Sequence, residues 1–367
     1  MSHARPLGRL KAAVLFAALI VVACAVPHFS AAAEGNMVKV RRGNGEVEGL
    51  PLVWSTDFAA VLRGDGVLFT FDPREVSVEK TTRAFQPYTT MAMRRALERE
   101  FGSDYEVTAA GNYLVVHPRG QGNAWAARFD ELYRGFQRYF SVRGFTLKPP
   151  KFPLVAVVLR SREDYLRYLQ KHSPGTPTST LGFYAPATNR VLLYDAAGGN
   201  DAAWHVNAET IIHEATHQTA FNTGLHNRFG VTPRWVAEGL GMLFEARGVW
   251  TGRAGGPQSE RIHPERLADF RRYAQNGRSE DALVELIAGD QPFRRDMHNA
   301  YAESWALTFY LSETRPREYA RYLAKIAARG DFQSYSSQER LADFTSIFGT
   351  NLRHLDAQFV RYMNELR

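Results

Sequence analysis

Two histidines four residues apart, with a glutamate directly after the first, are the strongest chemical signal in the sequence: His213, Glu214 and His217 of His-Glu-Ala-Thr-His. The flanking residues predict a helix, on which this spacing puts both imidazoles on one face, where they can bind one Zn²⁺. The intervening glutamate lies near the ion without ligating it, so it can take a proton from metal-bound water. The sequence therefore predicts a zinc site with Glu214 as catalytic base; the alternative is a pair of structural histidines on a helix surface.

A catalytic zinc ion needs a third protein ligand and keeps its fourth position for water. The extended pattern HExxHxxGxxH does not supply this ligand, because Ala220 and Thr223 replace its glycine and last histidine. The better candidate is Glu238, which follows on the next predicted helix within Trp235-Val236-Ala237-Glu238-Gly239-Leu240. His226, in a loop, is the rival ligand, and Glu238 as a plain surface glutamate is the other alternative.

Residues 213–218 and 235–240 together resemble the gluzincin superfamily of zinc metallopeptidases. The resemblance is closest to secreted proteins of the peptidase MA-like type, which carry HEATHQ followed by W-x-x-E-G-L. Weaker similarity in residues 134–145 and 189–195 extends it over about residues 100–320. The resemblance implies that Glu238 is the third ligand and that Gly239 lets its helix approach closely.

The same resemblance bears on the residues around the metal. Many gluzincins place an acidic residue one turn after the ligand glutamate to orient a histidine, but this sequence has Met242 there. We therefore expect Glu209 or Glu245 to accept the imidazole N–H. Residues 298–305 resemble a gluzincin segment that supplies an oxyanion donor, which makes Tyr301 the candidate; a tyrosine of the helix core is the alternative.

A strand predicted at residues 181–184 precedes the metal helix, as the cleft-edge strand does in peptidases of this architecture. An extended substrate could pair with it, and Gly182 would permit close approach of the two backbones. The alternative is an interior hairpin strand.

Hydrophobic periodicity predicts the elements that position these residues. The predicted strands are 67–71, 105–107, 113–116, 152–159, 181–184 and 191–194. Strands 105–107 and 113–116 form one predicted hairpin, and strands 181–184 and 191–194 form another. The predicted helices before the metal motif are 91–101, 124–140 and 162–170. The metal helix covers 203–222, with Asp201 or Asn200 as its cap, and the next helix has Thr232 as N-cap and Pro233 at its first position. Further helices are predicted at 264–273, 282–287, 298–312, 315–328 and 351–366.

These elements predict an α+β fold of the bilobal gluzincin type, in which a small mixed sheet and the active-site helix precede a helical C-terminal subdomain. We expect an N-terminal α+β accessory module at 34–119, a metallopeptidase core at 120–250 and the helical subdomain at 251–367.

Residues 1–33 have the pattern of a signal peptide. Three basic residues precede an apolar run at 12–26 that is too short to span a bilayer in the mature protein. Ala31-Ala32-Ala33 fits cleavage before Glu34, whereas the residues ending at Cys24 resemble a lipoprotein processing site, which would leave a lipid anchor on that cysteine. We favour soluble export and predict a secreted, periplasmic or cell-envelope protein without a transmembrane span in its mature chain.

Composition narrows the possible partners. The formal net charge is +7, but Lys and Arg are spread along the chain rather than collected in one stripe, so nucleic-acid binding is not expected. Cys24 is the only cysteine, and a chain that begins at Glu34 can form no disulfide.

The sequence therefore predicts zinc-dependent hydrolysis of peptide bonds in a peptide or protein substrate. No motif that would bind a substrate terminus is recognisable, which favours an endopeptidase. A zinc-containing envelope binding protein with a structural or degenerate site is the alternative from another class. Hydrolysis of a non-peptide amide would use the same residues.

Overall fold

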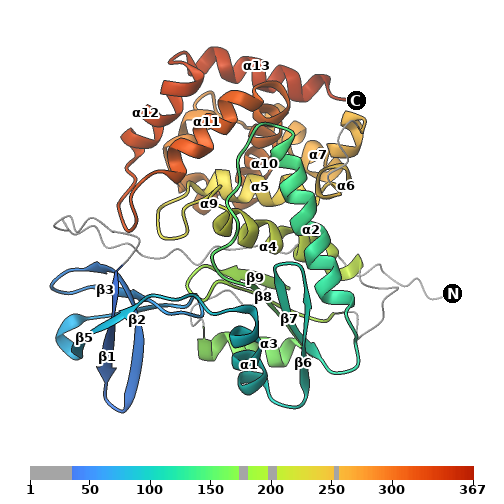
Figure 1. Cartoon of the computed structure of the whole chain (residues 1–367). Helices are drawn as coiled ribbons and strands as arrows, with labels where there is room; N and C mark the ends of the chain where they lie inside the picture. The colour runs from blue at the N-terminus through green and yellow to red at the C-terminus, as the bar shows by residue number, and fades with distance from the viewer. Residues whose placement is uncertain (1–34, 173–180, 197–204, 252–255) are drawn as a thin grey trace.

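The computed structural model describes residues 35–172, 181–196, 205–251 and 256–367. The predicted leader, Cys24 and the proposed caps Asn200 and Asp201 lie outside these residues. The described chain contains two five-stranded sheets and a helical C-terminal part, so the predicted α+β class is confirmed (Figure 1). Among the described residues, no helix is long and apolar enough to cross a membrane.

The first sheet is antiparallel throughout and has the order β4-β3-β2-β1-β5. Alternating apolar residues of its strands form a small core of their own, which includes Val40, Val61 and Phe71. Its strands are β1 (Asn36–Arg42), β2 (Gly45–Trp54), β3 (Ala59–Leu62), β4 (Leu68–Phe71) and β5 (Ser77–Ala84).

The second sheet is mixed and has the order β6-β7-β8-β10-β9. β8 runs parallel to both of its neighbours, while β6–β7 and β9–β10 are antiparallel hairpins, as predicted. Its strands are β6 (Tyr105–Ala110), β7 (Tyr113–Pro118), β8 (Leu154–Leu159), β9 (Gly182–Ala185) and β10 (Arg190–Tyr194). β9 is an edge strand of this sheet.

The pairing of β7 with β8 corrects the boundary predicted at residue 119. That boundary assigned β6 and β7 to the N-terminal module, but both strands belong to the sheet that supports the metal helix. α1 (Thr90–Phe101) also packs on these strands, through Met93 and Leu97. The two sheets therefore divide between Ala84 and Thr90.

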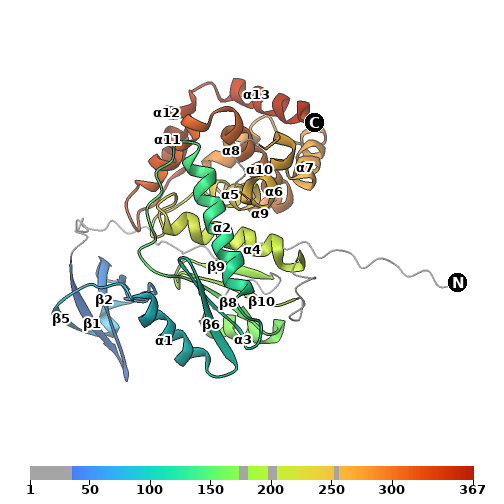
Figure 2. The same cartoon turned by 45° about the vertical axis from the view of Figure 1, so that its right-hand side comes forward.

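Helices cover both faces of the second sheet (Figures 1 and 2). α2 (Ala124–Ser141) and α4 (His205–Asn222) pack on the face that carries Tyr113 and Val115. α1 and α3 (Arg162–His172) pack on the opposite face, which carries Leu114 and Val116. Successive side chains of a strand point to opposite faces of the sheet, and α4 packs on one of these faces. The side of α4 that points away from the sheet is available to the C-terminal helices.

The C-terminal part is helical, as predicted. α5 begins at Arg234, and its N-cap residue is Pro233 in an extended conformation without a side-chain cap, so the prediction of Thr232 as N-cap is wrong. α12 was not predicted, although Ser336 and Glu339 form a capping box at its start. The helices are α5 (Arg234–Glu245), α6 (Arg247–Trp250), α7 (Pro264–Gln275), α8 (Ala282–Ala288), α9 (Gln291–Arg295), α10 (Met297–Thr314), α11 (Pro316–Ala327), α12 (Ser337–Phe348) and α13 (Leu352–Glu365).

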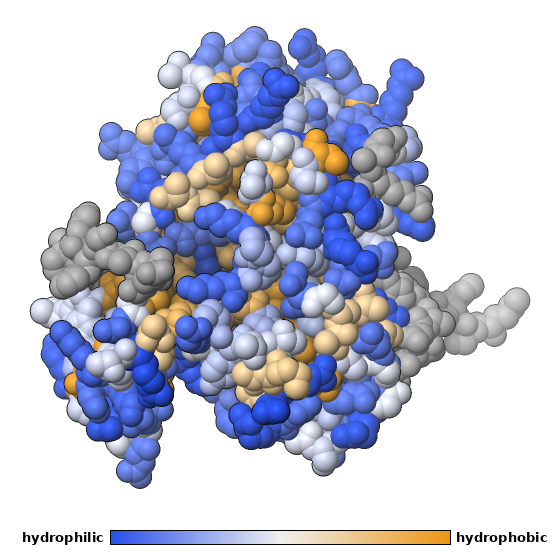
Figure 3. All heavy atoms as spheres, in the orientation of Figure 1, coloured by the Kyte–Doolittle hydropathy of each residue, from blue (hydrophilic) through white to orange (hydrophobic). Residues whose placement is uncertain are grey.

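The surface drawn in Figure 3 is predominantly hydrophilic, and apolar atoms show in separate patches. The large apolar side chains that are exposed are separated along the chain: Phe58, Val78, Tyr88, Met91 and Val142. The largest apolar core lies between the second sheet, α4 and the C-terminal helices. The metal motif lies within this core.

Candidate metal centre

The centre forms where α4 crosses α5. Every side chain of α5 from Trp235 to Phe244 is buried, because the helix packs on α4 and on α10. Two glycines permit these approaches. A Cβ at Gly239 would lie 2.5 Å from the Ser304 carbonyl oxygen of α10, and one at Gly241 would lie 2.6 Å from Cε1 of His213. Gly239 therefore lets α5 approach α10, whereas the approach to the metal helix depends on Gly241 and not, as expected from the resemblance, on Gly239.

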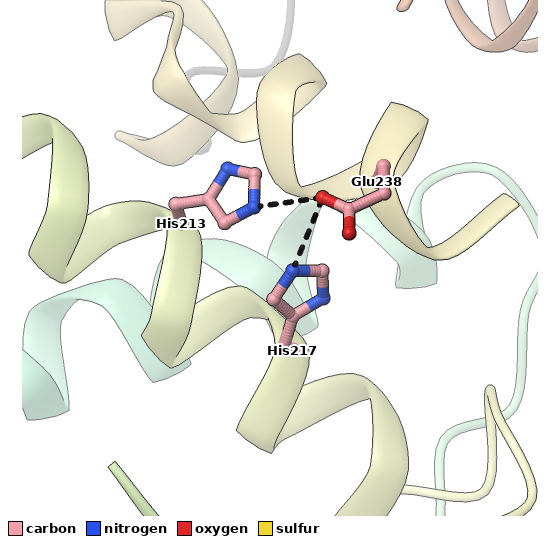
Figure 4. Close-up of side chains that lie close together, drawn as sticks. All are labelled: His213, His217 and Glu238. Atoms are coloured by element: carbon pink, nitrogen blue, oxygen red, sulfur yellow. Dashed lines mark ion pairs between the residues drawn. The ribbon is translucent and has the colours of Figure 1, made fainter. Parts of the chain in front are cut away.

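His213, His217 and Glu238 come together as predicted (Figure 4). Their ligand atoms all lie within 4.8 Å of one another, and their exposures are 3%, 1% and 0%. Oε2 of Glu238 lies 3.4 Å from Nε2 of His213 and 4.0 Å from Nε2 of His217. Two imidazoles on one helix and a carboxylate on the next can therefore hold a metal ion.

The environment of Glu238 fits a metal ion. Neither of its carboxylate oxygens has a hydrogen-bond partner among the described residues, although both are buried. A buried carboxylate without hydrogen-bond donors is costly, and a divalent cation would offset that cost. Two histidine nitrogens and one carboxylate oxygen are a donor set typical of catalytic zinc.

His226, the rival ligand, does not belong to this group. Its ring packs edge-on against Phe221, with centroids 5.2 Å apart, and its Nδ1 lies 3.1 Å from the carbonyl oxygen of Leu225. Burial lowers the pKa of His226 to about 4, so the imidazole is neutral. It is a buried histidine beside the centre.

Glu245 at the end of α5 orients the first histidine. Its Oε1 lies 2.8 Å from Nδ1 of His213, and its Oε2 lies 3.1 Å from Nε2 of His263. Glu209, the other predicted partner, is exposed, and Met242 is buried in the core. An Nδ1–H donated to Glu245 leaves Nε2 of His213 directed toward Glu238 as the metal-binding nitrogen.

In the metal-free protein, the charge of His213 and the charges of the groups around it affect one another's pKa values. Burial lowers the pKa of His213, but the neighbouring carboxylates of Glu238 and Glu245 outweigh burial and raise it to about 10. Burial and the charge of His213 hold the pKa of His217 well below its ordinary value. Burial raises the pKa of Glu245, but hydrogen bonds with His213 and His263 lower it to about 2. A metal ion must therefore displace a proton from His213.

Glu214 lies on a neighbouring face of α4, toward the sheet. Its Oε2 accepts a hydrogen bond of 2.6 Å from the backbone N–H of Tyr184 on β9, and its Oε1 is buried and has no hydrogen-bond partner in the described part of the chain. Burial raises its pKa to about 8, against the opposing effects of His213 and the Tyr184 N–H. A carboxyl group in this state can exchange protons near neutral pH.

Tyr301 on α10 is connected to the centre by Arg234, which contacts both Tyr301 and Glu238. Nη2 of Arg234 donates to Oη of Tyr301 at 3.3 Å, and its Nε lies 3.8 Å from Oε1 of Glu238. Burial, and then the negative charge of Glu238, raises the pKa of Tyr301, so its hydroxyl stays protonated. The sequence motifs do not single out Arg234, although its position one turn before the ligand glutamate is a signal that could have identified it.

One family model matches the chain, over residues 207–333, and is described as a protein of unknown function (DUF1570). The matched segment holds every residue of the centre described above except Tyr184. No curated protein matches the chain.

Proposed function

We propose that this chain is a zinc-dependent hydrolase of peptide bonds, an endopeptidase of the gluzincin type that acts outside the cytoplasm. The observation that carries the proposal is the convergence of His213, His217 and Glu238, with the carboxyl group of Glu214 on the same helix. Export is supported by the leader pattern of residues 1–33.

The ligand set supports zinc and leaves a position for chemistry. Three protein ligands are typical of catalytic zinc sites, whereas structural sites close the coordination with four. The described group has three members. When bound, Zn²⁺ supplies Lewis acidity and a water of lowered pKa.

Glu214 has the properties of the general base. Its carboxylate would take a proton from the attacking water and later pass it to the leaving amine nitrogen. The N–H of Tyr184 holds one oxygen, so the other can exchange this proton. A pKa raised to about 8 makes the carboxylate of Glu214 a stronger proton acceptor than an ordinary glutamate.

Tyr301 is the proposed donor to the oxyanion that forms on the substrate carbonyl. Arg234 donates to its hydroxyl oxygen, which fixes the phenol relative to the carboxylate of Glu238. A donor held in place before the reaction stabilises developing charge without reorganisation.

A non-catalytic metal protein is the second candidate, and the exposure of the ligands favours it. His213, His217 and Glu238 are at most 3% exposed, which leaves little of the ligand surface open to a substrate. Hydrolysis of a non-peptide amide remains a variant of the first proposal.

One comparison tests these proposals. Purified protein that begins at Glu34 is assayed for bound metal and for digestion of a peptide library, beside Glu214→Gln. We expect about one zinc per chain in both proteins and cleavage by the wild type alone. A zinc-loaded wild type that cleaves no peptide overturns the peptidase proposal, and a Glu214→Gln variant that still cleaves overturns the role of Glu214.

A further inference from the structure

The face of α4 that lies on the sheet carries three polar residues at a spacing of four, Glu214, Gln218 and Asn222. This spacing places them in one row along the helix. All three make hydrogen bonds to β9 or to the turn that joins β9 to β10. The function proposed above uses only Glu214, so the other two need a separate explanation.

Asn189 in the β9–β10 turn receives most of these bonds. Its φ is 60°, it is 3% exposed, and its backbone N–H donates to the carbonyl oxygen of Ala185 at 2.8 Å. Its carbonyl oxygen accepts from Nε2 of Gln218 at 2.8 Å. Its side-chain amide exchanges two hydrogen bonds, of 2.8 and 2.7 Å, with that of Asn222. The turn is thus fixed to α4 through both its backbone and its side chain.

Tyr184 connects this turn to the catalytic base. Its phenol donates to Oδ1 of Asn189 at 2.7 Å, and its backbone N–H donates to Oε2 of Glu214 at 2.6 Å. Its ring stacks on Phe221, with centroids 5.8 Å apart. A movement of the turn relative to α4 would therefore move the N–H group that holds Glu214.

We propose that Asn189 is a positioning residue that acts on Glu214 through Tyr184. The inference rests on the proposed function, in which Glu214 is the base. Asn189 ties the turn to Gln218 and Asn222, and the turn holds the Tyr184 N–H against Oε2, so that Oε1 is the oxygen available to the proton of the attacking water. A displacement of about 1 Å in such an arrangement can cost on the order of a hundredfold in rate.

Two variants loosen this connection without touching the metal ligands. Asn189→Gly removes the side chain and keeps a residue that adopts positive φ without strain. Tyr184→Phe removes only the hydroxyl. Tyr335→Phe is the matched control, because it removes a buried phenol that donates to Asp343 at 2.9 Å in the C-terminal helices.

The variants are compared as zinc-loaded protein from Glu34 onward, by hydrogen exchange at the Tyr184 amide and by kcat and KM on a peptide that the wild type cleaves. In Asn189→Gly and Tyr184→Phe we expect exchange to rise and kcat to fall about tenfold, with KM within about twofold and zinc content unchanged. The double variant should be no slower than Asn189→Gly alone, because both changes break one connection. Tyr335→Phe should keep the wild-type exchange and kcat.

Wild-type exchange at Tyr184 in Asn189→Gly, or wild-type kcat despite faster exchange, would overturn the role of Asn189. An equal loss of kcat in Tyr335→Phe would show general destabilisation and would also overturn it. A zinc-loaded wild type without activity fails at an earlier step, since it overturns the hydrolase function itself and the catalytic role of Asn189 with it.

Discussion

Gly241 lies directly against the imidazole of His213: a Cβ added to this glycine would lie 2.6 Å from Cε1 and 2.8 Å from Nε2 of the ring. Nδ1 of the same ring is hydrogen-bonded to Oε1 of Glu245. α5 thus supplies the ligand Glu238 and Glu245, which orients His213. At Gly241 it also leaves the space that the imidazole ring occupies.

Gly241→Ala should therefore weaken metal binding. The added methyl group must displace either the His213 ring or α5, and we expect roughly a tenfold to hundredfold loss of zinc affinity, as for other disturbances around metal ligands. Competition with a chromophoric chelator measures the affinity. Gly289→Ala is the control, since its Cβ would meet only Oγ of Ser337 at 3.9 Å. Equal affinities in the two variants would contradict this role of Gly241.

Glu238→Gln should abolish stable zinc binding, because it replaces the negative ligand with a neutral amide. His226→Gln should keep about one zinc per chain, since His226 lies outside the ligand group. Elemental analysis after dialysis against a weak chelator measures the zinc content. Loss of zinc in His226→Gln with retention in Glu238→Gln would reverse the assignment of the third ligand.

Glu245→Gln should lower zinc affinity by about tenfold to hundredfold, because His213 loses the charged acceptor that orients it. Glu209→Gln, at an exposed position of α4, should leave the affinity unchanged. The same chelator competition compares them, and a loss in Glu209→Gln would indicate the other orienting residue.

The pair of Glu245 and His213 also predicts a pH dependence of stability in metal-free protein. Glu245 has a lowered pKa, so it stabilises the fold above its unfolded pKa of 4.5, and this is lost as pH falls toward 2. His213 has a raised pKa, so it stabilises the fold below its unfolded pKa of 6.5, and this is lost as pH rises toward 10. The pair should stabilise most between pH 4.5 and 6.5.

Glu245→Gln should therefore lower the free energy of unfolding by roughly 3 kcal/mol in this window, and by less on either side of it. Urea unfolding of the metal-free wild type and variant at several pH values gives this difference. A difference that does not vary between pH 3 and pH 10 would show that the two groups are not coupled in this way.

Tyr301→Phe should lower kcat about a hundredfold, with KM and zinc content nearly unchanged, if Tyr301 stabilises the oxyanion. Tyr310→Phe is the control on the same helix, because Tyr310 is buried against Phe359 and Tyr362. Steady-state kinetics on a cleaved peptide compare the two variants. Equal kcat in both would make Tyr301 a core residue.

The sequence by itself determined the features that depend on neighbours within a few residues. The spacing of His213 and His217 puts both rings on one face wherever that helix lies. The hairpins β6–β7 and β9–β10 and most helix limits follow from local periodicity and turns in the same way. Glu238 could also be predicted from the sequence, because the resemblance to a known motif implies the third ligand without knowledge of how α4 and α5 cross.

Only the tertiary structure decided the features that depend on long-range packing. The parallel pairing of β7 with β8 joins segments separated by a whole helix, and no local sequence pattern predicts it. Because of this pairing, the N-terminal module ends before β6 and not at residue 119. The contact of Gly241 with His213, the hydrogen bond from Tyr184 to Glu214 and the position of Arg234 depend on how α4 lies between the sheet and the C-terminal helices. Such contacts are set by close packing across elements, which periodicity along one element does not specify.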